Sequence, residues 1–220
     1  LYPSGRVSAI QEQQLTTYGG NITALEVEGS FDDCQHMVKE AFVDQKVNQQ
    51  RSLSSANSIN IARILPQSVY YAWAWKQIGT DRPIVFSVPS GNFGNLTGGI
   101  LAKHMGLPVE KFIAATNAND VFPKYLETGE FNAKPSKQTI SNAMDVGRPS
   151  NFDRILKIYN ENVTDLRRDL ISWSFQDDET RNAIQYTKNK FNYLTDPHTA
   201  VGLSGIEKFR QEVNAHITGI

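Results

Sequence analysis

One stretch of the chain restricts the possible folds more than any other, namely an apolar run that ends in a glycine-rich turn. Residues 83–88 read PIVFSV, and residues 89–95 follow as PSGNFGN. An uninterrupted apolar run is typical of a strand buried on both faces, and such strands occur chiefly in parallel sheets that helices cover on both sides. A helical pattern at residues 96–104 begins directly after the turn. This order predicts an α/β fold with a parallel sheet.

The N-terminal part of the chain predicts a βαβα order of its own. Ser8 and Gln11 have the spacing of a capping box, which opens a helix, and residues 21–29 read as a short strand. Asp32 then begins an amphipathic helix in which Cys34 is predicted to be a core residue. Because short loops separate alternating strands and helices, the strands are predicted to be parallel.

The remainder of the chain continues this alternation. A long helix is predicted from Ser58, and Pro66 is expected to kink or divide it. Residues 111–117 read as a strand, residues 177–191 as a helix, and residues 196–209 as a turn followed by a helix. The aromatic residues of the long helix are predicted to pack against the sheet; they are Tyr70, Tyr71, Trp73 and Trp75.

These elements predict parallel sheets in two domains. Residues 1–52 are assigned to part of a smaller βαβα domain, and residues 53–220 to part of a larger α/β domain. The polar stretch DQKVNQQRSLSS, which precedes the long helix, is the predicted boundary.

Charge and composition narrow the classes of function. A formal net charge of -1 and a pI near 6.5 give no electrostatic argument for binding nucleic acid or a membrane surface. Cys34 is the single cysteine, so the chain has no internal disulfide framework, and a cytoplasmic location is predicted. No apolar run is long enough to span a bilayer. The spacing of His36, His104 and His216 predicts no metal site.

The turn at residues 91–95 has the composition of an anion site. In a strand-turn-helix unit the first amide groups of the helix and the positive end of its dipole point at one spot, and glycine lets the backbone approach a ligand. Asn92 and Asn95 add side-chain donors. Phe93 stands where the dinucleotide fingerprint needs glycine, and no P-loop lysine follows. A single phosphate on a compact cofactor is the better fit, and an ordinary tight turn is the alternative.

A second candidate anion site precedes the same strand, in the stretch SANSINIAR at residues 55–63. Asn57 and Ser58 lie where the long helix is predicted to begin. Arg63 follows little more than one turn later, and its guanidinium can reach back to a phosphate or carboxylate. The alternative is that Ser58 only caps the helix and Arg63 is a solvated charge. Together the two sites predict a cofactor phosphate and a substrate phosphate bound side by side.

These motifs resemble those of the threonine synthases, which belong to the fold-type-II family of enzymes that use pyridoxal 5'-phosphate (PLP). The resemblance extends over essentially the whole chain, because further segments match the family in the same order. They are LYPSGRVSAIQEQQLTTYGGNI, VEGSFDDCQHMVKEAF, KFIAATNANDVFPKYLETG, SNAMDVGRPSNF and DPHTAVG. The resemblance implies two α/β domains with parallel sheets, in the architecture of the tryptophan synthase β chain.

The resemblance also implies roles for particular residues. Gly91, Asn92, Phe93, Gly94 and Asn95 match the loop that holds the PLP phosphate in this family, and Asn142 and Ala143 match a stretch that lines the cofactor pocket. Asn57, Ser58 and Arg63 match residues that bind the substrate phosphate, and Thr199 is a further substrate-binding candidate. Asp196 and His198 lie where related enzymes approach the cofactor ring, although a helix cap at Asp196 or Thr199 is the alternative.

The activity implied is the conversion of O-phosphohomoserine and water to threonine and phosphate, the last step of threonine biosynthesis. No catalytic residue is assigned, because the family's cofactor-linked lysine follows a phenylalanine and precedes an aspartate, and the chain has no such setting. Lys103, Lys111 and Lys124 lie in surface-like contexts. The chain therefore reads as an internal piece of a larger enzyme, a monomer or homodimer, and is expected to be inactive alone. The alternative function is a non-catalytic doubly wound domain that binds a phosphorylated small molecule.

Overall fold

The structure is a computed structural model that describes residues 1–213 and 218–220. The chain divides into two compact units, Leu1–Ser55 and Ala56–Ile220. The predicted domain boundary, between residues 52 and 53, lies close to this division. The assignment of the two units to domains of a longer protein stays a prediction.

The first unit is a small βαβα arrangement followed by one further short helix. Its elements are β1 (Tyr2–Pro3), α1 (Ala9–Thr16), β2 (Glu26–Val27), α2 (Phe31–Val43) and α3 (Gln45–Gln50). The two strands pair in parallel, as predicted. The predicted capping box of Ser8 and Gln11 is present. Cys34 is buried, as predicted, and burial raises the pKa of its thiol.

The second unit is built on a four-stranded sheet in the order β5-β4-β3-β6. Its strands are β3 (Ile84–Pro89), β4 (Val109–Thr116), β5 (Leu170–Ser174) and β6 (Thr218–Gly219). All of its strand pairs are parallel, so the predicted parallel sheet is confirmed. The carboxyl ends of β3 and β4 therefore lie at the same edge, and the Ser90 amide donates to the Ala115 carbonyl at 2.8 Å.

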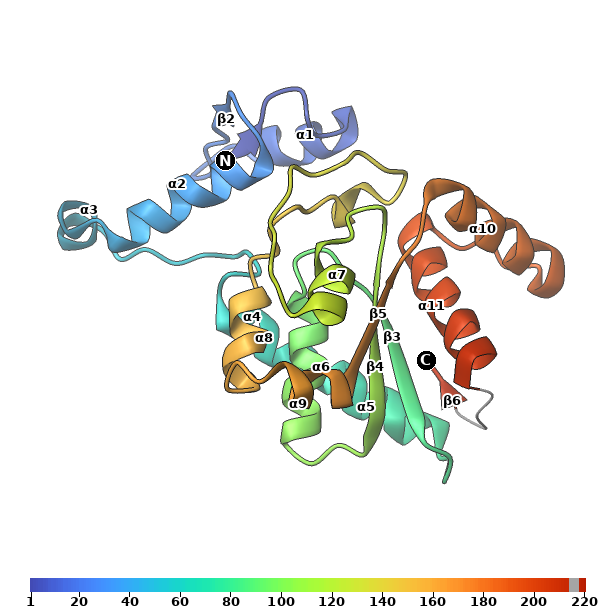
Figure 1. Ribbon diagram of the computed structural model, residues 1–220. Coiled ribbons are helices and arrows are strands. Elements are labelled where there is room, and N and C mark those ends of the chain that lie inside the picture. The colour runs from blue at the N-terminus through green and yellow to red at the C-terminus, as the bar shows by residue number, and fades with distance from the viewer. Residues whose placement is uncertain (214–217) are drawn as a thin grey trace. The chain divides into compact units, whose positions relative to one another are not determined.

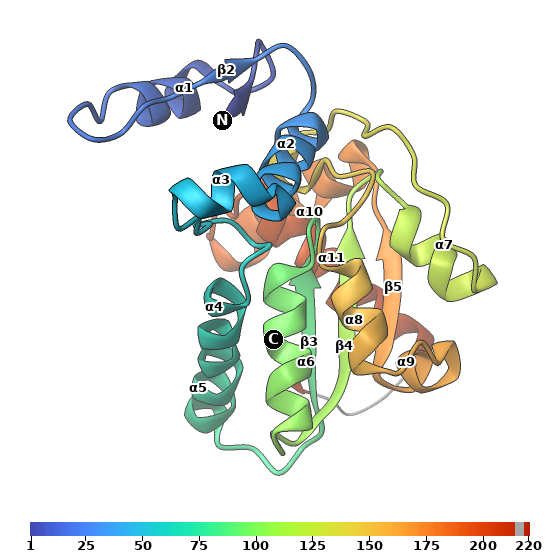
Figure 2. The ribbon, with the colours of Figure 1, turned by 90° about the vertical axis from the view of Figure 1, so that its left-hand side faces the viewer.

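Helices lie on both faces of this sheet (Figures 1 and 2). The helices are α4 (Ile61–Ile64), α5 (Ser68–Ile78), α6 (Gly94–His104), α7 (Val121–Thr128), α8 (Phe152–Ile158), α9 (Val163–Asp169), α10 (Asp177–Phe191) and α11 (Pro197–Val213). Alternate residues of β3 serve two cores, because successive strand side chains point to opposite faces. Ile84 and Phe86 join the core under α6 and α8, and Val85 joins the core under α11.

The predicted long helix differs from the structure at its start. The chain turns at residues 57–60, and α4 begins at Ile61 with Asn60 as its N-cap, so the prediction of a helix from Ser58 is wrong. The cap is formed by the Asn60 side chain, which accepts from the Ala62 amide at 3.0 Å. Pro66 divides the helix as predicted, within the 3-10 segment Leu65–Gln67.

The aromatic residues of α5 also differ from prediction. Tyr71 is buried between Phe86 and Phe112, whereas Tyr70, Trp73 and Trp75 are exposed. Successive helix residues are rotated by about 100°, so a helix on the surface of a sheet buries only one stripe of its side chains. The prediction that all four rings pack on the sheet is therefore wrong for three of them.

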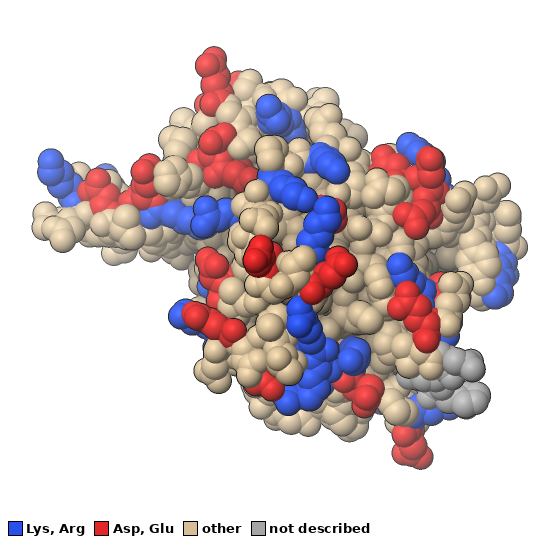
Figure 3. Space-filling view, viewed as in Figure 1, with Lys and Arg blue, Asp and Glu red and all other residues tan. Residues whose placement is uncertain are grey.

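Charged side chains of both signs are interspersed on the face drawn in Figure 3. This mixture agrees with the formal net charge of -1. Among the described residues, no helix combines the length and apolar character that crossing a membrane requires.

Candidate functional site

The predicted glycine-rich loop connects the carboxyl end of β3 to the first turn of α6. Ser90 is buried, and its hydroxyl donates to the Val88 carbonyl at 2.7 Å. Phe93 precedes the helix with a φ of 58°, a left-handed conformation that costs free energy in a residue with a bulky side chain. Its ring is buried against Phe122, with 4.6 Å between the ring centroids. This packing holds the strained residue in place.

The loop presents a row of backbone donors. Within the described part of the chain, the amide N–H groups of residues 91–95 donate to no protein acceptor. Gly91 and Gly94 are half-buried and Asn95 is exposed, so solvent reaches the loop. Unpaired amides at the positive end of a helix dipole form an anion site, and these fit the phosphate group of PLP.

The two asparagine side chains of the loop are largely used inside the protein. Asn92 Oδ1 accepts from the Ser150 amide at 3.1 Å, and the Asn92 carbonyl accepts from the Asn151 side chain at 2.9 Å. Asn95 Oδ1 accepts from the Tyr71 hydroxyl at 2.7 Å, and its Nδ2 donates to Gln67 at 3.0 Å. The Asn95 side chain therefore ties α6 to the preceding helical segments, and its backbone amide is the group left for an anion.

The second predicted anion segment lies against the loop. A Cβ placed on Gly94 would be 3.4 Å from the Ser58 Cβ, so the two segments are in contact distance at this point. Asn57 Oδ1 accepts from the Ser58 amide at 2.6 Å and from its hydroxyl at 3.2 Å. The Arg63 guanidinium forms no hydrogen bond or ion pair with the described residues. The structure thus brings both predicted segments together, and their ligands stay predictions.

Asn142 and Ala143 lie in the short 3-10 turn Asn142–Met144, which packs on the loop. A Cβ on Gly91 would be 2.8 Å from Met144 Cα and 3.2 Å from the Ala143 carbonyl oxygen. No side chain larger than hydrogen fits there without backbone movement. The close approach explains why glycine occupies position 91.

The segment Asp196–Thr199 forms a cap at the start of α11. Asp196 Oδ1 accepts from the amides of His198 and Thr199 at 2.9 and 3.3 Å. The Thr199 hydroxyl donates to Asp196 Oδ2 at 2.5 Å, and this bond is the largest cause that lowers the pKa of Asp196 to about 2. The role of Thr199 in binding substrate stays a prediction, as do the roles of Asp196 and His198.

His198 links this cap to the 3-10 turn. Its Nε2 accepts from the Ala143 amide at 3.3 Å, and its Nδ1 lies 3.0 Å from Asp196 Oδ1. An Nε2 that accepts leaves the proton on Nδ1, where it is donated to the carboxylate. The imidazole therefore holds the turn beside the glycine loop.

Two residues near the loop were not predicted as site residues. Asn151 is fully buried, and its side chain donates to the Asn92 carbonyl. Arg154 bonds to Asn151 Oδ1 and donates to the Ile59 carbonyl at 3.0 Å. Asn151 lies in the family-like segment SNAMDVGRPSNF, which was matched without assigning a role to that residue, and Arg154 follows two residues after it.

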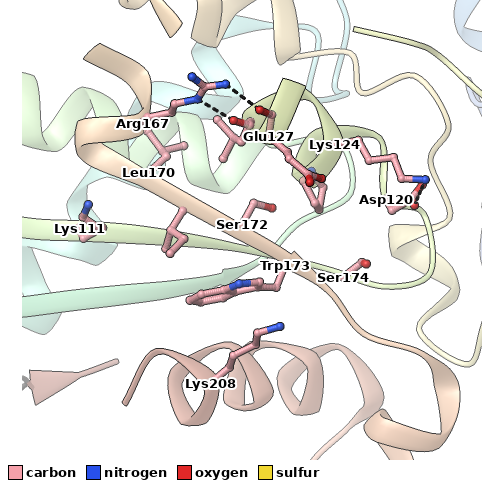
Figure 4. A pocket seen from close by; sticks show the side chains of 13 residues that line it. Lys111, Asp120, Lys124, Glu127, Arg167, Leu170, Ser172, Trp173, Ser174 and Lys208 are labelled. Carbon is pink, nitrogen blue, oxygen red and sulfur yellow. Dashed lines mark hydrogen bonds and ion pairs between the residues drawn. The ribbon is translucent and has the colours of Figure 1, made fainter. Parts of the chain in front are cut away.

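A cavity of about 530 Å³ lies elsewhere, along the edge strand β5 (Figure 4). Some of the charged side chains that line it already have partners in the protein. Lys124 forms an ion pair with Asp120 at 2.7 Å, and Arg167 donates to the backbone carbonyls of Leu126 and Glu127. None of the predicted site residues is among its lining residues. Its size alone does not make it the functional site.

The named lysines and histidines lie outside the glycine loop. Lys103 is in the last turn of α6 and pairs with Asp169 at 3.1 Å, roughly 13 Å along the helix from Gly94. Lys111 lines the β5 cavity. His104 packs on Tyr159, and His216 lies outside the described residues.

Comparison with known proteins agrees with this geometry. The family described as pyridoxal-phosphate dependent enzyme matches residues 1–218. Threonine synthase from Haemophilus influenzae is 44% identical over 222 residues, which cover 100% of this chain and 51% of that protein. The crystal structure of threonine synthase from Escherichia coli matches with a TM-score of 0.89 and 41% identity, over 99% of this chain and 50% of that chain. The PLP-bound threonine synthase from Brucella melitensis matches with a TM-score of 0.82 and 36% identity, over 99% and 52%.

The chain spans about half the length of the curated relatives it matches. The predicted resemblance to threonine synthases and the predicted α/β fold are confirmed by these matches, as is PLP as the cofactor of the family. Because the family match extends over residues 1–218, the chain belongs to the family of pyridoxal-phosphate-dependent enzymes.

Proposed function

We propose that this chain is part of a threonine synthase, which converts O-phosphohomoserine and water to threonine and phosphate with PLP as cofactor. The proposal is supported by threonine synthases that are 44% identical to the chain. We further propose a cytoplasmic enzyme that works as a monomer or homodimer.

The observation that carries the proposal is the close approach of the two segments that were predicted to bind anions. Ser58 lies 3.4 Å from the Cβ position of Gly94, where the unpaired amides of residues 91–95 begin a helix. A reaction between a phosphorylated cofactor and a phosphorylated substrate requires two neighbouring phosphate pockets. An ordinary strand-to-helix turn would not need the second pocket.

In this arrangement the backbone amides of residues 91–95 hold the cofactor phosphate, and Asn142 and Ala143 lie beside it. Asn57, Ser58 and Arg63 hold the substrate phosphate, with Thr199 as a further substrate contact. Bound PLP supplies the electron sink for the chemistry at the substrate carbons. As the carbon–oxygen bond to the leaving phosphate breaks, negative charge grows on that phosphate, and the donors around it bind more strongly.

The test compares two polypeptides, this chain and the product of the complete reading frame that encodes it. We expect the complete product to release phosphate and form threonine from O-phosphohomoserine when PLP is present. We expect no turnover by the chain alone, because it has no lysine in the family's cofactor-linked setting. Threonine formation by the purified chain would refute the second expectation, and an inactive complete product would refute the function.

Crystals of the chain soaked with PLP and inorganic phosphate test the pockets directly. Two anions are expected, one on residues 91–95 and one on Asn57, Ser58 and Arg63. A single anion, or anions elsewhere, would favour the alternative of a non-catalytic domain that binds one phosphorylated molecule.

A further inference from the structure

We infer that Arg154 is a positioning residue that fixes the two phosphate pockets relative to each other, acting partly through Asn151. This inference rests on the proposed function, because it concerns the same two pockets. Neither residue need touch cofactor or substrate for this role.

Arg154 is connected to both segments at once. It bonds to Asn151 Oδ1, and its Nη2 donates to the Ile59 carbonyl at 3.0 Å. Asn151 in turn donates from Nδ2 to the Asn92 carbonyl at 2.9 Å. A single guanidinium on α8 thus joins the glycine loop to the segment that precedes α4.

The bond from Asn151 sets the direction of a donor in the cofactor pocket. In a planar trans peptide the carbonyl and the following N–H point in opposite directions. Asn151 draws the Asn92 carbonyl toward α8, so the Phe93 N–H is directed away from α8, where it has no acceptor among the described residues. The bond also helps to hold Phe93 at its φ of 58°.

The bond from Arg154 to Ile59 fixes the other pocket. The turn around Ser58 is closed by the Asn60 amide, which donates to the Asn57 carbonyl at 3.1 Å. The guanidinium holds the Ile59 carbonyl within that turn, where the Ser58 side chain meets the Gly94 position. The planar guanidinium presents donors in fixed directions, which a lysine ammonium does not reproduce.

Asn151 is fully buried, so its side-chain oxygen and nitrogen cannot exchange their protein partners for water unless the structure opens locally. Loss of the Arg154 donor would leave Asn151 Oδ1 without a partner in the described structure. An unsatisfied buried acceptor is costly, so the side chain would rotate and release the Asn92 carbonyl. Arg154 therefore contributes to the spacing of the pockets on the side of α8, and the bonds of Asn95 to Gln67 and Tyr71 hold α6 on the other side.

The test measures binding of anion probes to the chain by the amide NMR signals of Ser58, Gly91, Phe93 and Gly94. The probes are inorganic phosphate and a series of alkane bisphosphonates that differ in the number of methylene groups between the two phosphonates. The original chain is expected to prefer one bisphosphonate length. Arg154→Met is expected to lose that preference, to bind inorganic phosphate about tenfold more weakly at the loop, and to lose the phosphate-induced shift of the Phe93 amide.

Three further variants make the result specific. Arg154→Lys is expected to restore part of the affinity but little of the length preference. Asn151→Asp can still accept from Arg154 but cannot donate to Asn92, so it is expected to weaken phosphate binding at the loop. Arg168→Met is the matched control, because Arg168 is 70% exposed and its ion pairs within residues 1–213 and 218–220 are those with Asp165 and Asp169. It should bind every probe like the original chain. Circular dichroism and Tm verify that each variant is folded.

The outcomes separate the inference from the proposed function. If the original chain prefers one length and folded Arg154→Met or Arg154→Lys keeps that preference, the inference is wrong and the proposed function stands. If the original chain binds neither phosphate nor any bisphosphonate at these residues, the two-pocket function fails and the inference fails with it. If Arg154→Met does not fold, the lysine and aspartate variants decide in the same way.

Discussion

At the scale of single residues, position 91 is the most restricted part of the site. A Cβ on Gly91 would be 2.8 Å from Met144 Cα, a backbone atom that cannot rotate away, whereas a Cβ on Gly94 would be 3.4 Å from a side-chain carbon. Gly91→Ala is therefore expected to displace the loop from the 3-10 turn and to weaken phosphate binding at least tenfold, because the donor geometry is lost. Isothermal titration of the chain with inorganic phosphate measures this.

Gly94→Ala is the matched control for that substitution. Its Cβ would make an ordinary contact, so we expect phosphate affinity within about threefold of the original chain, together with an unchanged Tm. Equal losses in both variants would contradict the steric argument and would point to a general need for glycine flexibility.

Asp196 gives the site a pH-dependent contribution to stability. Its folded pKa of about 2 lies below the ordinary value of 3.8, so the ionised carboxylate favours the folded chain. This contribution is complete above a pH of about 4 and is lost as the pH falls toward about 2. Asp196→Ala is expected to lower the free energy of unfolding at pH 7 by about 1 kcal/mol, the typical value of an N-cap.

Urea unfolding at a series of pH values measures both effects. The stability of Asp196→Ala should fall less steeply between pH 4 and pH 2 than that of the original chain. Asp196→Asn keeps one acceptor for the cap amides but has neither the charge nor the second oxygen that accepts from the Thr199 hydroxyl. Its stability at pH 7 should therefore lie between those of Asp196→Ala and the original chain, and its acid slope should be the shallower one. Parallel acid slopes in all three proteins would show that another carboxylate dominates.

At the scale of secondary-structure elements, the sequence predicts those with strong local signals. Helix α10 occupies the predicted residues 177–191, because acidic residues open it and Asn192, with a φ of 51°, ends it. The uninterrupted apolar run at residues 83–88 likewise predicts β3. Strand β5, with the residues LISWS, was not predicted, although Ile171, Ser172, Trp173 and Ser174 alternate as in a half-buried strand. Helices α8 and α9 have 7 residues each, too few for a clear helical period.

The residues of the candidate site show the same difference between local signals, which the sequence reveals, and long-range contacts, which it does not. The anion segments are short contiguous motifs, so residues 91–95 and Asn57–Ser58 are visible in the sequence. Asn151 and Arg154 bond to partners 59 and 95 residues away, and no local pattern encodes such a pairing. The outward faces of α5 were mispredicted because an aromatic run does not reveal which stripe of a helix meets the sheet.

The packing of α6 on its neighbours gives a prediction at this scale. A Cβ on Gly99 would be 2.6 Å from the Tyr71 ring and 2.7 Å from the Phe112 ring, and both rings are buried. Gly99→Ala is expected to destabilise the chain by about 1–3 kcal/mol through overpacking, despite the better helix propensity of alanine. Urea unfolding measures the change. Exposed Lys76→Ala on α5 should stay within about 0.5 kcal/mol of the original chain. A stabilised Gly99→Ala would mean that the rings move apart freely.

At the scale of the whole molecule, the outer face of α5 is one exposed apolar surface through which chains can associate. Val69, Tyr70 and Trp73 are 62%, 64% and 60% exposed, and their spacing places Tyr70 and Trp73 next to each other on the helix surface. An exposed apolar patch of this kind associates with other apolar surfaces. We therefore expect the purified chain to sediment as a concentration-dependent mixture of monomer and larger species.

The double variant Tyr70→Ser with Trp73→Gln removes the two rings without changing charge or any described hydrogen bond. It should sediment as a monomer over a wider concentration range than the original chain, because less apolar area is available for association. Phe191→Ser on α10 is the control, since Phe191 is also 62% exposed but lies on a different helix. If the control dissociates the larger species and the double variant does not, association uses α10 and not α5. Sedimentation velocity at several concentrations separates these cases, because a specific α5 contact shifts the distribution only in the double variant.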